Sequence, residues 1–162
     1  MTIENKQMSE HFGLFELTTT EHRKHLDQNR LSAIAPELYK KGVVLCETLL
    51  EPIRNHFGKP LIVHSGYRCP ALNKAIRGSK TSQHILFEAC DFHIVGVDLN
   101  DVFKAIRFKM KPTLEWGQFI LEGYSCGHPS WLHISLRGNR PLNKCQEVKI
   151  SEDGGKTYVR IT

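Results

Sequence analysis

The sequence has no long apolar run. None of its stretches approaches the roughly 20 consecutive apolar residues that a membrane-spanning helix needs. The first ten residues also contain no apolar segment like that of a secretory signal peptide. We therefore expect a protein that is made in the cytoplasm, is not inserted into a membrane, and reaches a target outside the cell only after release by another factor.

Cysteine is scarce as well. The chain has five cysteines, an odd number, and no pair has the Cys-x-x-Cys spacing of zinc ribbons or thioredoxin-like sites. Small disulfide-stabilised domains normally carry more cysteines, in even numbers. The sequence therefore predicts reduced thiols, most of them in the core, at Cys46, Cys69, Cys90, Cys126 and Cys145.

The sequence has no basic arm and no aromatic RNA-binding motif, although its net charge is +5 and its pI is about 9.0. Its lysines and arginines are spread along the chain, with only short pairs such as Lys40-Lys41. A positive charge suits an anionic partner, either nucleic acid or an anionic cell envelope. The charge alone does not choose between them.

Internal repeats and low-complexity linkers are also absent, so residues 1–162 are expected to form one domain. Helices are predicted at 18–29, 36–56, 71–76 and 100–110, with N-caps among Thr18 to Thr20 and at Asn100. Strands are predicted at 61–65, 89–95, 116–121, 131–136, 147–151 and 156–161. The last four are expected to be antiparallel, with a tight turn at 153–155. The pattern predicts an α+β domain in which helices flank a small antiparallel sheet.

Two histidines and an aspartate could form a metal site. His84 ends a polar loop, Asp91 starts an apolar strand seven positions later, and His133 lies in a later strand-like segment. Imidazole nitrogen and carboxylate oxygen both suit zinc, and three protein ligands leave a fourth position for water. On spacing alone, an arrangement without metal is more common. In that alternative His84 is a loop residue, Asp91 caps a helix or turn, and His133 is a core histidine.

Seven short motifs follow one another between Met8 and Leu136. They are Ser9-Glu10-His11-Phe12, Leu50-Glu51-Pro52-Ile53-Arg54, Ser65-Gly66-Tyr67-Arg68, Leu72-Asn73-Lys74, Gly78-Ser79-Lys80-Thr81-Ser82-Gln83-His84, Ala89-Cys90-Asp91-Phe92 and Trp131-Leu132-His133-Ile134-Ser135. In type and order they resemble the zinc D-alanyl-D-alanine carboxypeptidase family, M15-type peptidases that include phage L-alanyl-D-glutamate endolysins. The resemblance implies the fold of Hedgehog and D-Ala-D-Ala peptidase domains.

The resemblance also implies an activity and its residues. It implies one zinc ion, with the ligands His84, Asp91 and His133. It implies hydrolysis of an amide bond in peptidoglycan stem peptides, as a D,D-carboxypeptidase or an L-Ala-D-Glu endopeptidase, by a monomeric phage-type lytic protein. Arg68 corresponds to a residue that contacts substrate and stabilises developing negative charge, which suits a permanently charged guanidinium. Ser82 corresponds to a serine that hydrogen-bonds substrate, with Gln83 beside it.

Hydrolysis also needs a general base, and here the sequence departs from part of the family. Many members have an acidic residue three positions before the last histidine, where this chain has Ser130. Glu122 corresponds to a glutamate of nearer relatives and is the preferred candidate, because it can face His133 across adjacent strands. His128 is the second candidate and Glu88 the third. The alternative for Glu122 is an exposed carboxylate at the end of a strand.

Three further positions bear on the site. Phe87 stands where relatives usually have glycine, so its ring is expected to crowd the loop or line the substrate pocket. Gly117 stands where they often have aspartate, which removes a polar group. His93 would share a strand face with Asp91 as a neighbour of the ligands or an alternative ligand, but it is left out of the predicted metal set.

The sequence therefore favours a zinc amidohydrolase that acts on cell-wall peptide. Ser130, Gly117 and Phe87 support a second hypothesis, a catalytically inactive, zinc-stabilised module that binds the wall or belongs to a virion. A basic nucleic-acid-binding domain, supported by charge alone, ranks far behind; it would bind DNA with steep salt dependence and need no metal.

Overall fold

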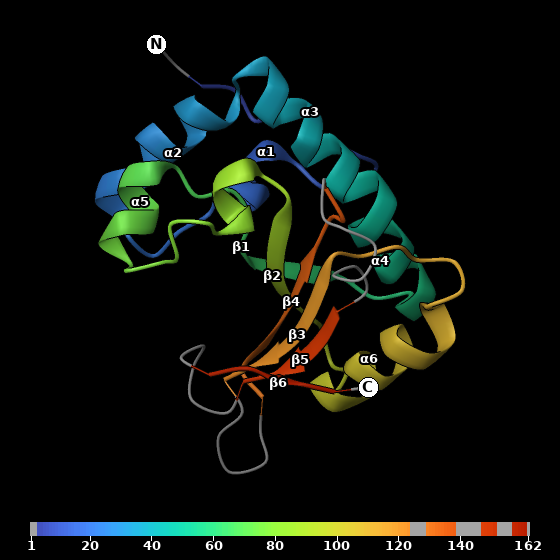
Figure 1. The fold of residues 1–162 in the computed structure, drawn as a ribbon. Coiled ribbons are helices and arrows are strands. Elements are labelled where there is room, and N and C mark those ends of the chain that lie inside the picture. Colours follow the sequence, from blue (N-terminus) through green and yellow to red (C-terminus); the bar gives the residue numbers. More distant parts are fainter. Residues whose placement is uncertain (1–2, 124–128, 139–146, 152–156, 162) are drawn as a thin grey trace.

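The computed structural model describes residues 3–123, 129–138, 147–151 and 157–161. A six-stranded sheet lies at the centre, with α5 (Pro70–Ala75) on one side and α3 (Pro36–Leu45), α4 (Glu51–Phe57) and α6 (Leu99–Lys104) on the other (Figure 1). The predicted α+β class is confirmed. No helix in these residues is both long and apolar enough to cross a membrane.

The strands form one sheet in the order β1-β2-β4-β3-β5-β6. They are β1 (Leu61–Ser65), β2 (Ala89–Ile94), β3 (Gln118–Glu122), β4 (Trp131–Ser135), β5 (Glu147–Ile150) and β6 (Val159–Arg160). All neighbours are antiparallel except β3 and β5, which are parallel. The expected antiparallel pairing is therefore confirmed for β5 with β6 but wrong for β5 with β3, because β4 and β5 follow each other in the chain but are not neighbours in the sheet. β6 is shorter than the predicted span, and the predicted turn at 153–155 lies outside the described residues.

The long helix predicted over 36–56 is confirmed. It consists of α3, a π-helical turn η2 (Cys46–Leu50) and α4, and it ends at Gly58, whose φ is 58°. The wide turn ends two residues before Pro52, which has no N–H to donate, and its wider backbone eases the contact that proline makes inside a regular helix. Leu45, Leu49 and Ile53 are fully buried along its inner face.

The remaining helices are α1 (Leu14–Leu17), η1 (Arg23–His25), α2 (Leu26–Ala33), α5, η3 (Gln83–Leu86), and α6 followed by η4 (Ala105–Met110). The helix predicted from Thr18 begins later than expected. The Thr18 hydroxyl donates to the Leu14 carbonyl (2.7 Å), and the Thr20 hydroxyl accepts from the His22 N–H (3.1 Å). Thr18 therefore closes α1 and Thr20 shapes a turn, and neither caps the helix predicted over 18–29.

The helix predicted over 100–110 is confirmed, with one correction at its start. The N-cap is Asp98 rather than Asn100, because an Asp98 carboxylate oxygen accepts from the Asn100 N–H (2.9 Å). The helix predicted over 71–76 is α5. The expected core location of the cysteines is confirmed for Cys46, Cys69 and Cys90, which are buried free thiols; Cys126 and Cys145 lie outside the described residues.

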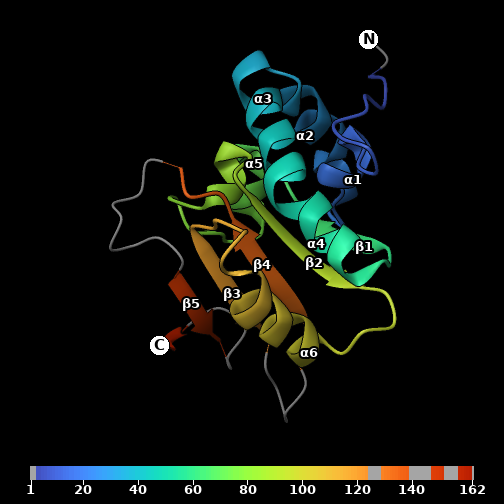
Figure 2. The ribbon, with the colours of Figure 1, turned by 90° about the vertical axis from the view of Figure 1, so that its right-hand side faces the viewer.

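The two faces of the sheet have different roles. Alternate residues such as Phe92, Leu132 and Phe119 point into the core beneath the long helix and α6, which stand in front of the sheet in Figure 2. Because side chains alternate along a strand, the same register turns Asp91 and His133 to the opposite face. The fold therefore keeps one face for packing and leaves the other for a site.

Candidate metal centre

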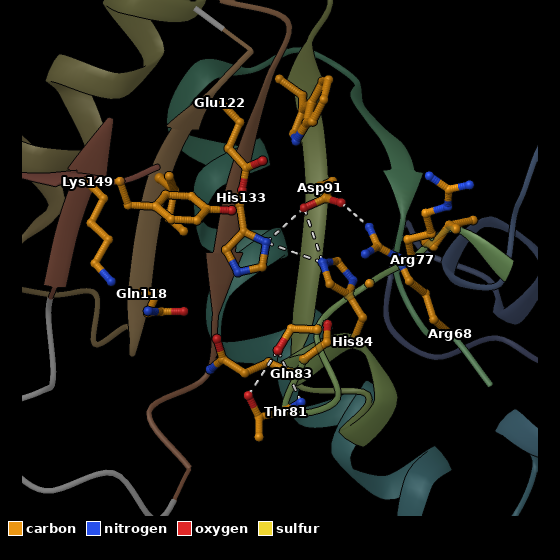
Figure 3. A pocket seen from close by; sticks show the side chains of 17 residues that line it. Arg68, Arg77, Thr81, Gln83, His84, Asp91, Gln118, Glu122, His133 and Lys149 are labelled. Carbon is orange, nitrogen blue, oxygen red and sulfur yellow. Dashed lines mark hydrogen bonds and ion pairs between the residues drawn. The ribbon is translucent and has the colours of Figure 1, made fainter. Parts of the chain in front are cut away.

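His84, Asp91 and His133 come together on the open face of the sheet (Figure 3). One nitrogen or oxygen from each lies within 4.8 Å of the other two, and all three residues are buried. Asp91 on β2 lies directly opposite His133 on β4. The Asp91 Oδ1 is 2.8 Å from His133 Nδ1 and 3.2 Å from His84 Nε2. The predicted ligands therefore form one compact group that could hold a metal ion.

The surroundings suit metal binding. The His84 Nδ1 donates to the Gly66 carbonyl oxygen at 2.6 Å, which leaves the Nε2 lone pair directed at the other ligands. The Arg68 Nη2 donates to Asp91 Oδ2 and leaves Oδ1 beside the histidines. The group thus offers two imidazole nitrogens and one carboxylate oxygen, a set of ligands that zinc accepts. Each of them is oriented by a further hydrogen bond or by the sheet.

The protonation states fit the same use. Burial lowers the pKa of His84, because an imidazolium is poorly solvated there. Burial alone would raise the pKa of Asp91, but the charges and hydrogen bonds of His84 and His133 outweigh it and hold that pKa well below its usual value. Both groups are therefore kept in the forms that bind metal, a neutral imidazole and a carboxylate.

A cavity of about 660 Å³ opens onto the group. Its lining includes the three possible ligands together with the predicted site residues Arg68, Ser82, Gln83 and Glu122. The group is therefore open to a cavity on this face of the sheet, and Asp91 and His133 are carried by the paired strands β2 and β4. Three ligands at the wall of a cavity leave room for a water molecule on the metal, which a catalytic metal site requires.

Glu122 lies at the end of β3, on the same sheet face as His133. Figure 3 shows its carboxylate pointing toward His133 and Asp91. Burial raises its pKa, with a further rise from the charge of Asp91 and opposing effects from His133 and Arg68. Its carboxylate has no hydrogen-bond partner among the described residues. A carboxylate with a raised pKa and unused acceptor capacity is suited to taking up a proton.

Arg68 follows β1 and is fixed by three bonds. Its N–H donates to the His84 carbonyl (3.1 Å), its Nε to the Ser65 hydroxyl (2.7 Å) and its Nη2 to Asp91 Oδ2 (2.5 Å). Within the described chain no residue accepts from Nη1. Arg68 therefore orients a possible metal ligand, a role that the sequence did not reveal, and still lines the cavity.

The peptidase M15 family matches residues 10–135, which include every residue of the metal group and Glu122. The chain belongs to this family. No curated protein matches the chain closely enough to count as a relative. In an M15 peptidase, a buried group of two histidines and an aspartate at the wall of a cavity is a plausible metallopeptidase site.

The structure places the other candidate residues of this M15 protein as follows. The Glu88 carboxylate binds Lys41 Nζ on α3 (2.7 Å) and does not line the cavity, so the fold does not bring it to the metal group. His128 lies outside the described residues. The Gln83 side chain donates to the Ser135 hydroxyl (2.7 Å), which ties η3 to β4.

Phe87 does not line the cavity, so the expectation that its ring lines the substrate pocket is wrong. Its φ is 58°, the left-handed region that glycine favours, which accounts for glycine at this position in relatives. The ring is fully buried, 5.2 Å from the Tyr67 ring between centroids. A Cβ on Gly42 would lie 2.8 Å from two Phe87 ring carbons, so glycine at 42 makes room for the ring.

The structure also places Gly117, His93 and Ser130. A Cβ on Gly117 would lie 2.3 Å from the Leu136 carbonyl oxygen, so this backbone leaves no space for a side chain. The His93 Nδ1 contacts His64 Nε2 at 2.8 Å, and His93 is not part of the metal group. The Ser130 hydroxyl donates to the Gly123 carbonyl (3.2 Å).

Several cavity residues were missed by sequence reasoning. Gln118 and Trp131 line the cavity, and the two-residue alternation along their strands could have found them, since Gln118 shares a face with Glu122 and Trp131 with His133. Lys149 also lines it, but its placement depends on the parallel pairing of β5, which no sequence signal indicated.

Proposed function

We propose that this M15 protein is a zinc-dependent peptidase that hydrolyses an amide bond in the stem peptides of peptidoglycan. The observation that carries the proposal is the buried group of His84, Asp91 and His133 at the wall of a cavity. The family match supports peptide as the substrate class. The assignment to peptidoglycan rests on the motifs between Met8 and Leu136 and on the net charge of +5, which suits an anionic cell wall.

His84 Nε2, Asp91 Oδ1 and His133 Nδ1 would hold the ion. When bound there, zinc supplies Lewis acidity, which lowers the pKa of a water molecule and polarises a carbonyl group. Glu122 takes the proton of the attacking water and passes it to the nitrogen of the leaving amine. Because its pKa is raised, Glu122 holds a proton more strongly than an ordinary glutamate does, which suits a general base.

Arg68 has the complementary role. Its Nη1 donates to the carbonyl oxygen of the scissile amide as negative charge develops there, while Nη2 keeps Asp91 in place. Ser82 hydrogen-bonds the peptide at the cavity wall. Gln83 holds the loop that carries His84, through its bond to Ser135, and offers its side-chain oxygen to the substrate.

We place the action of the protein at the cell wall, after synthesis in the cytoplasm and release in a phage-infected cell, and we expect a monomer. The expected synthesis in the cytoplasm follows from the first ten residues, and the expected action in a phage-infected cell follows from the resemblance to phage endolysins. The cavity suits either a carboxypeptidase or an endopeptidase.

The test is hydrolysis of purified peptidoglycan by zinc-loaded protein, with new amine ends and free D-alanine as readouts. His84→Ala should abolish activity, and Glu122→Gln should lower kcat by about 100-fold or more, the usual contribution of a general base. Matched controls are His22→Ala and Glu115→Gln, because His22 and Glu115 are exposed and lie outside the cavity. Both controls should keep wild-type rates.

The alternatives give different results. Stoichiometric zinc binding without product would identify an inactive wall-binding or virion module, the hypothesis that Ser130 in place of an acidic residue favours. Salt-sensitive DNA binding that needs no metal would instead indicate a nucleic-acid-binding domain. Full activity in Glu122→Gln would remove Glu122 as the base and move that role to His128.

A further inference from the structure

Arg77 has a backbone conformation that its own residue type does not favour. Among the described residues other than glycine, Arg77 (φ 57°) and Phe87 (φ 58°) have left-handed backbones. This conformation is unfavourable for residues with bulky side chains. At Phe87 the fully buried ring offsets the cost. Arg77 has no such compensation, since its side chain is exposed and has no hydrogen bond or ion pair to any residue that the structure describes.

The turn around Arg77 does not explain the arginine. The Arg77 N–H donates to the Lys74 carbonyl (3.1 Å) and the Gly78 N–H to the Asn73 carbonyl (2.8 Å), the paired bonds that end a helix in a Schellman motif. The Asn73 side-chain amide also donates to the Gly78 and Ser79 carbonyls (3.3 and 3.0 Å). These bonds fix the backbone, and the position that Arg77 occupies is normally glycine. A glycine would suit the turn better, so the arginine is explained only by what its side chain does.

The Arg77 side chain lines the cavity of the metal group. Figure 3 places Arg77 with Arg68 on one side of that group and Lys149 on the other. Three cationic side chains thus line a cavity that contains two carboxylates, Asp91 and Glu122. A bound divalent ion would make the cavity still more positive. The positive potential of the cavity favours an anionic substrate. The Arg68 guanidinium donates to Ser65 and Asp91, whereas the Arg77 guanidinium has no partner among the described residues.

We propose that Arg77 is a specificity-determining residue that binds a carboxylate of the peptide substrate on the α5 side of the metal group, away from the scissile amide. The inference rests on the proposed function and deepens it, because it names the substrate class as an acidic stem peptide. A guanidinium forms two parallel hydrogen bonds with a carboxylate and gains much less from the neutral amide of the same shape. Arg77 therefore selects stem peptides with free acid groups over amidated ones.

The experiment compares three synthetic peptides with zinc-loaded protein. The first is L-Ala-γ-D-Glu-diaminopimelate-D-Ala-D-Ala with free acids. The second and third carry a primary amide in place of the D-Glu α-carboxylate or of the diaminopimelate side-chain carboxylate. For wild type we expect one of the two amides to lower kcat/KM by about 10-fold, mainly through KM, as loss of one charge-assisted bond implies. In Arg77→Gly that preference should fall to less than about 2-fold, and Arg77→Lys should keep part of it.

Two matched variants distinguish a direct contact between Arg77 and the substrate carboxylate from a general electrostatic attraction to the cavity. Lys149→Gln removes the same charge from the opposite side of the cavity, and Lys80→Gln removes it from an exposed residue that does not line the cavity. Both should keep the acid-over-amide preference, even if Lys149→Gln lowers all rates together. Arg77→Gly should melt at or above the wild-type temperature, because glycine suits the turn; this shows that its losses do not come from misfolding.

The inference is overturned if Arg77→Gly keeps the preference, if Lys149→Gln loses it equally, or if wild type prefers neither acid. Failure of the proposed function has a different signature, no cleavage of any of the three peptides. In that case the dissociation constants of the same peptides decide: an acid preference that Arg77→Gly abolishes supports the Arg77 site, and equal binding of acid and amide contradicts it.

Discussion

The His84 Nδ1 lies 2.6 Å from the Gly66 carbonyl oxygen, and this contact sets which imidazole nitrogen faces the metal position. Gly66 itself lies against α1, since a Cβ added to it would be 2.3 Å from the Leu17 carbonyl oxygen. The same Leu17 carbonyl accepts from the Tyr67 N–H at 2.7 Å. The N-terminal helix thus positions the carbonyl that orients a metal ligand.

Gly66→Ala should therefore weaken metal binding although residue 66 is not a ligand. The added methyl must push the backbone away from Leu17, which moves the carbonyl that fixes His84. We expect a loss of about 10–100-fold in zinc affinity, the usual effect of removing such an orienting partner. Competition with a chromophoric chelator measures it.

The control is Gly58→Ala, which places a methyl at a left-handed position (φ 58°) with nothing within 4 Å. It should cost about 1 kcal/mol of stability and leave zinc affinity unchanged. Equal affinities for Gly66→Ala and wild type would show that the Gly66 carbonyl does not orient the ligand.

The pH dependence of kcat/KM follows from the raised pKa of Glu122. Burial favours the neutral acid there, whereas a general base must be ionised. Activity should therefore rise with pH as Glu122 ionises. The pKa values of His84 and Asp91 are lowered, so these groups are already in their metal-binding forms across that range.

A pH–rate profile between pH 4 and 8 checks this, with bound zinc measured at each point so that metal loss is not mistaken for titration. In Glu122→Gln, the residual kcat/KM should no longer rise with pH on the acidic side of the profile. A limb that persists unchanged in that variant would mean that another group titrates.

Prediction from the sequence was correct where the local pattern of residues was strong. The segments 36–56 and 89–95 have apolar patterns that tertiary contacts reinforce, and the structure confirms their helix and strand. The spacing of His84, Asp91 and His133 in the sequence could not show that they meet, because that depends on the pairing of Asp91 with His133 across β2 and β4. The family motifs supplied what the spacing lacked.

Other features depend on contacts between distant residues and left no local signal. The bond from Arg68 to Asp91 joins residues 23 positions apart, and the strand β5 pairs with β3 instead of with β4, the strand that precedes it in the chain. Phe87 shows a different limit. The sequence predicted that the ring crowds the loop or lines the substrate pocket, but the ring is buried in the core, where Gly42 leaves space for it.

Glu51 links two of the family motifs and should make stability depend on pH. Its carboxylate accepts from the Ser9 hydroxyl (2.7 Å), the His11 N–H (2.7 Å) and the His11 Nδ1 (2.8 Å). Burial alone would raise the pKa of Glu51, but these hydrogen bonds outweigh it and lower that pKa. Its stabilising effect is therefore complete above the ordinary glutamate pKa and is lost as pH falls through the lowered pKa.

Glu51→Gln should lower the free energy of unfolding at pH 7 by about 1–3 kcal/mol, the usual cost of removing bonds to a buried charged group. The difference from wild type should shrink below about pH 4. Urea denaturation at several pH values measures both, with the exposed Glu47→Gln, one turn earlier, as a control that changes little. A deficit that is independent of pH would mean that Glu51 stabilises through packing alone.

Phe87 and Gly42 should be energetically coupled. Phe87→Gly removes backbone strain of about 1–3 kcal/mol but also a fully buried ring worth about 3–5 kcal/mol, so it should destabilise the protein. KM should not change, because the ring does not line the cavity. Gly42→Ala should also destabilise the wild type, because its methyl would meet the Phe87 ring at 2.8 Å and the Met8 methyl at 2.6 Å.

The double variant tests whether the ring is the cause. Without the ring, an alanine at position 42 meets only the end of the flexible Met8 side chain, and alanine is favoured over glycine inside a helix by about 0.5–1 kcal/mol. Gly42→Ala should then cost far less in the Phe87→Gly protein than in wild type, or even stabilise it. Denaturation of all four proteins gives the coupling energy, and additive effects would show that glycine at 42 serves some purpose other than making room for Phe87.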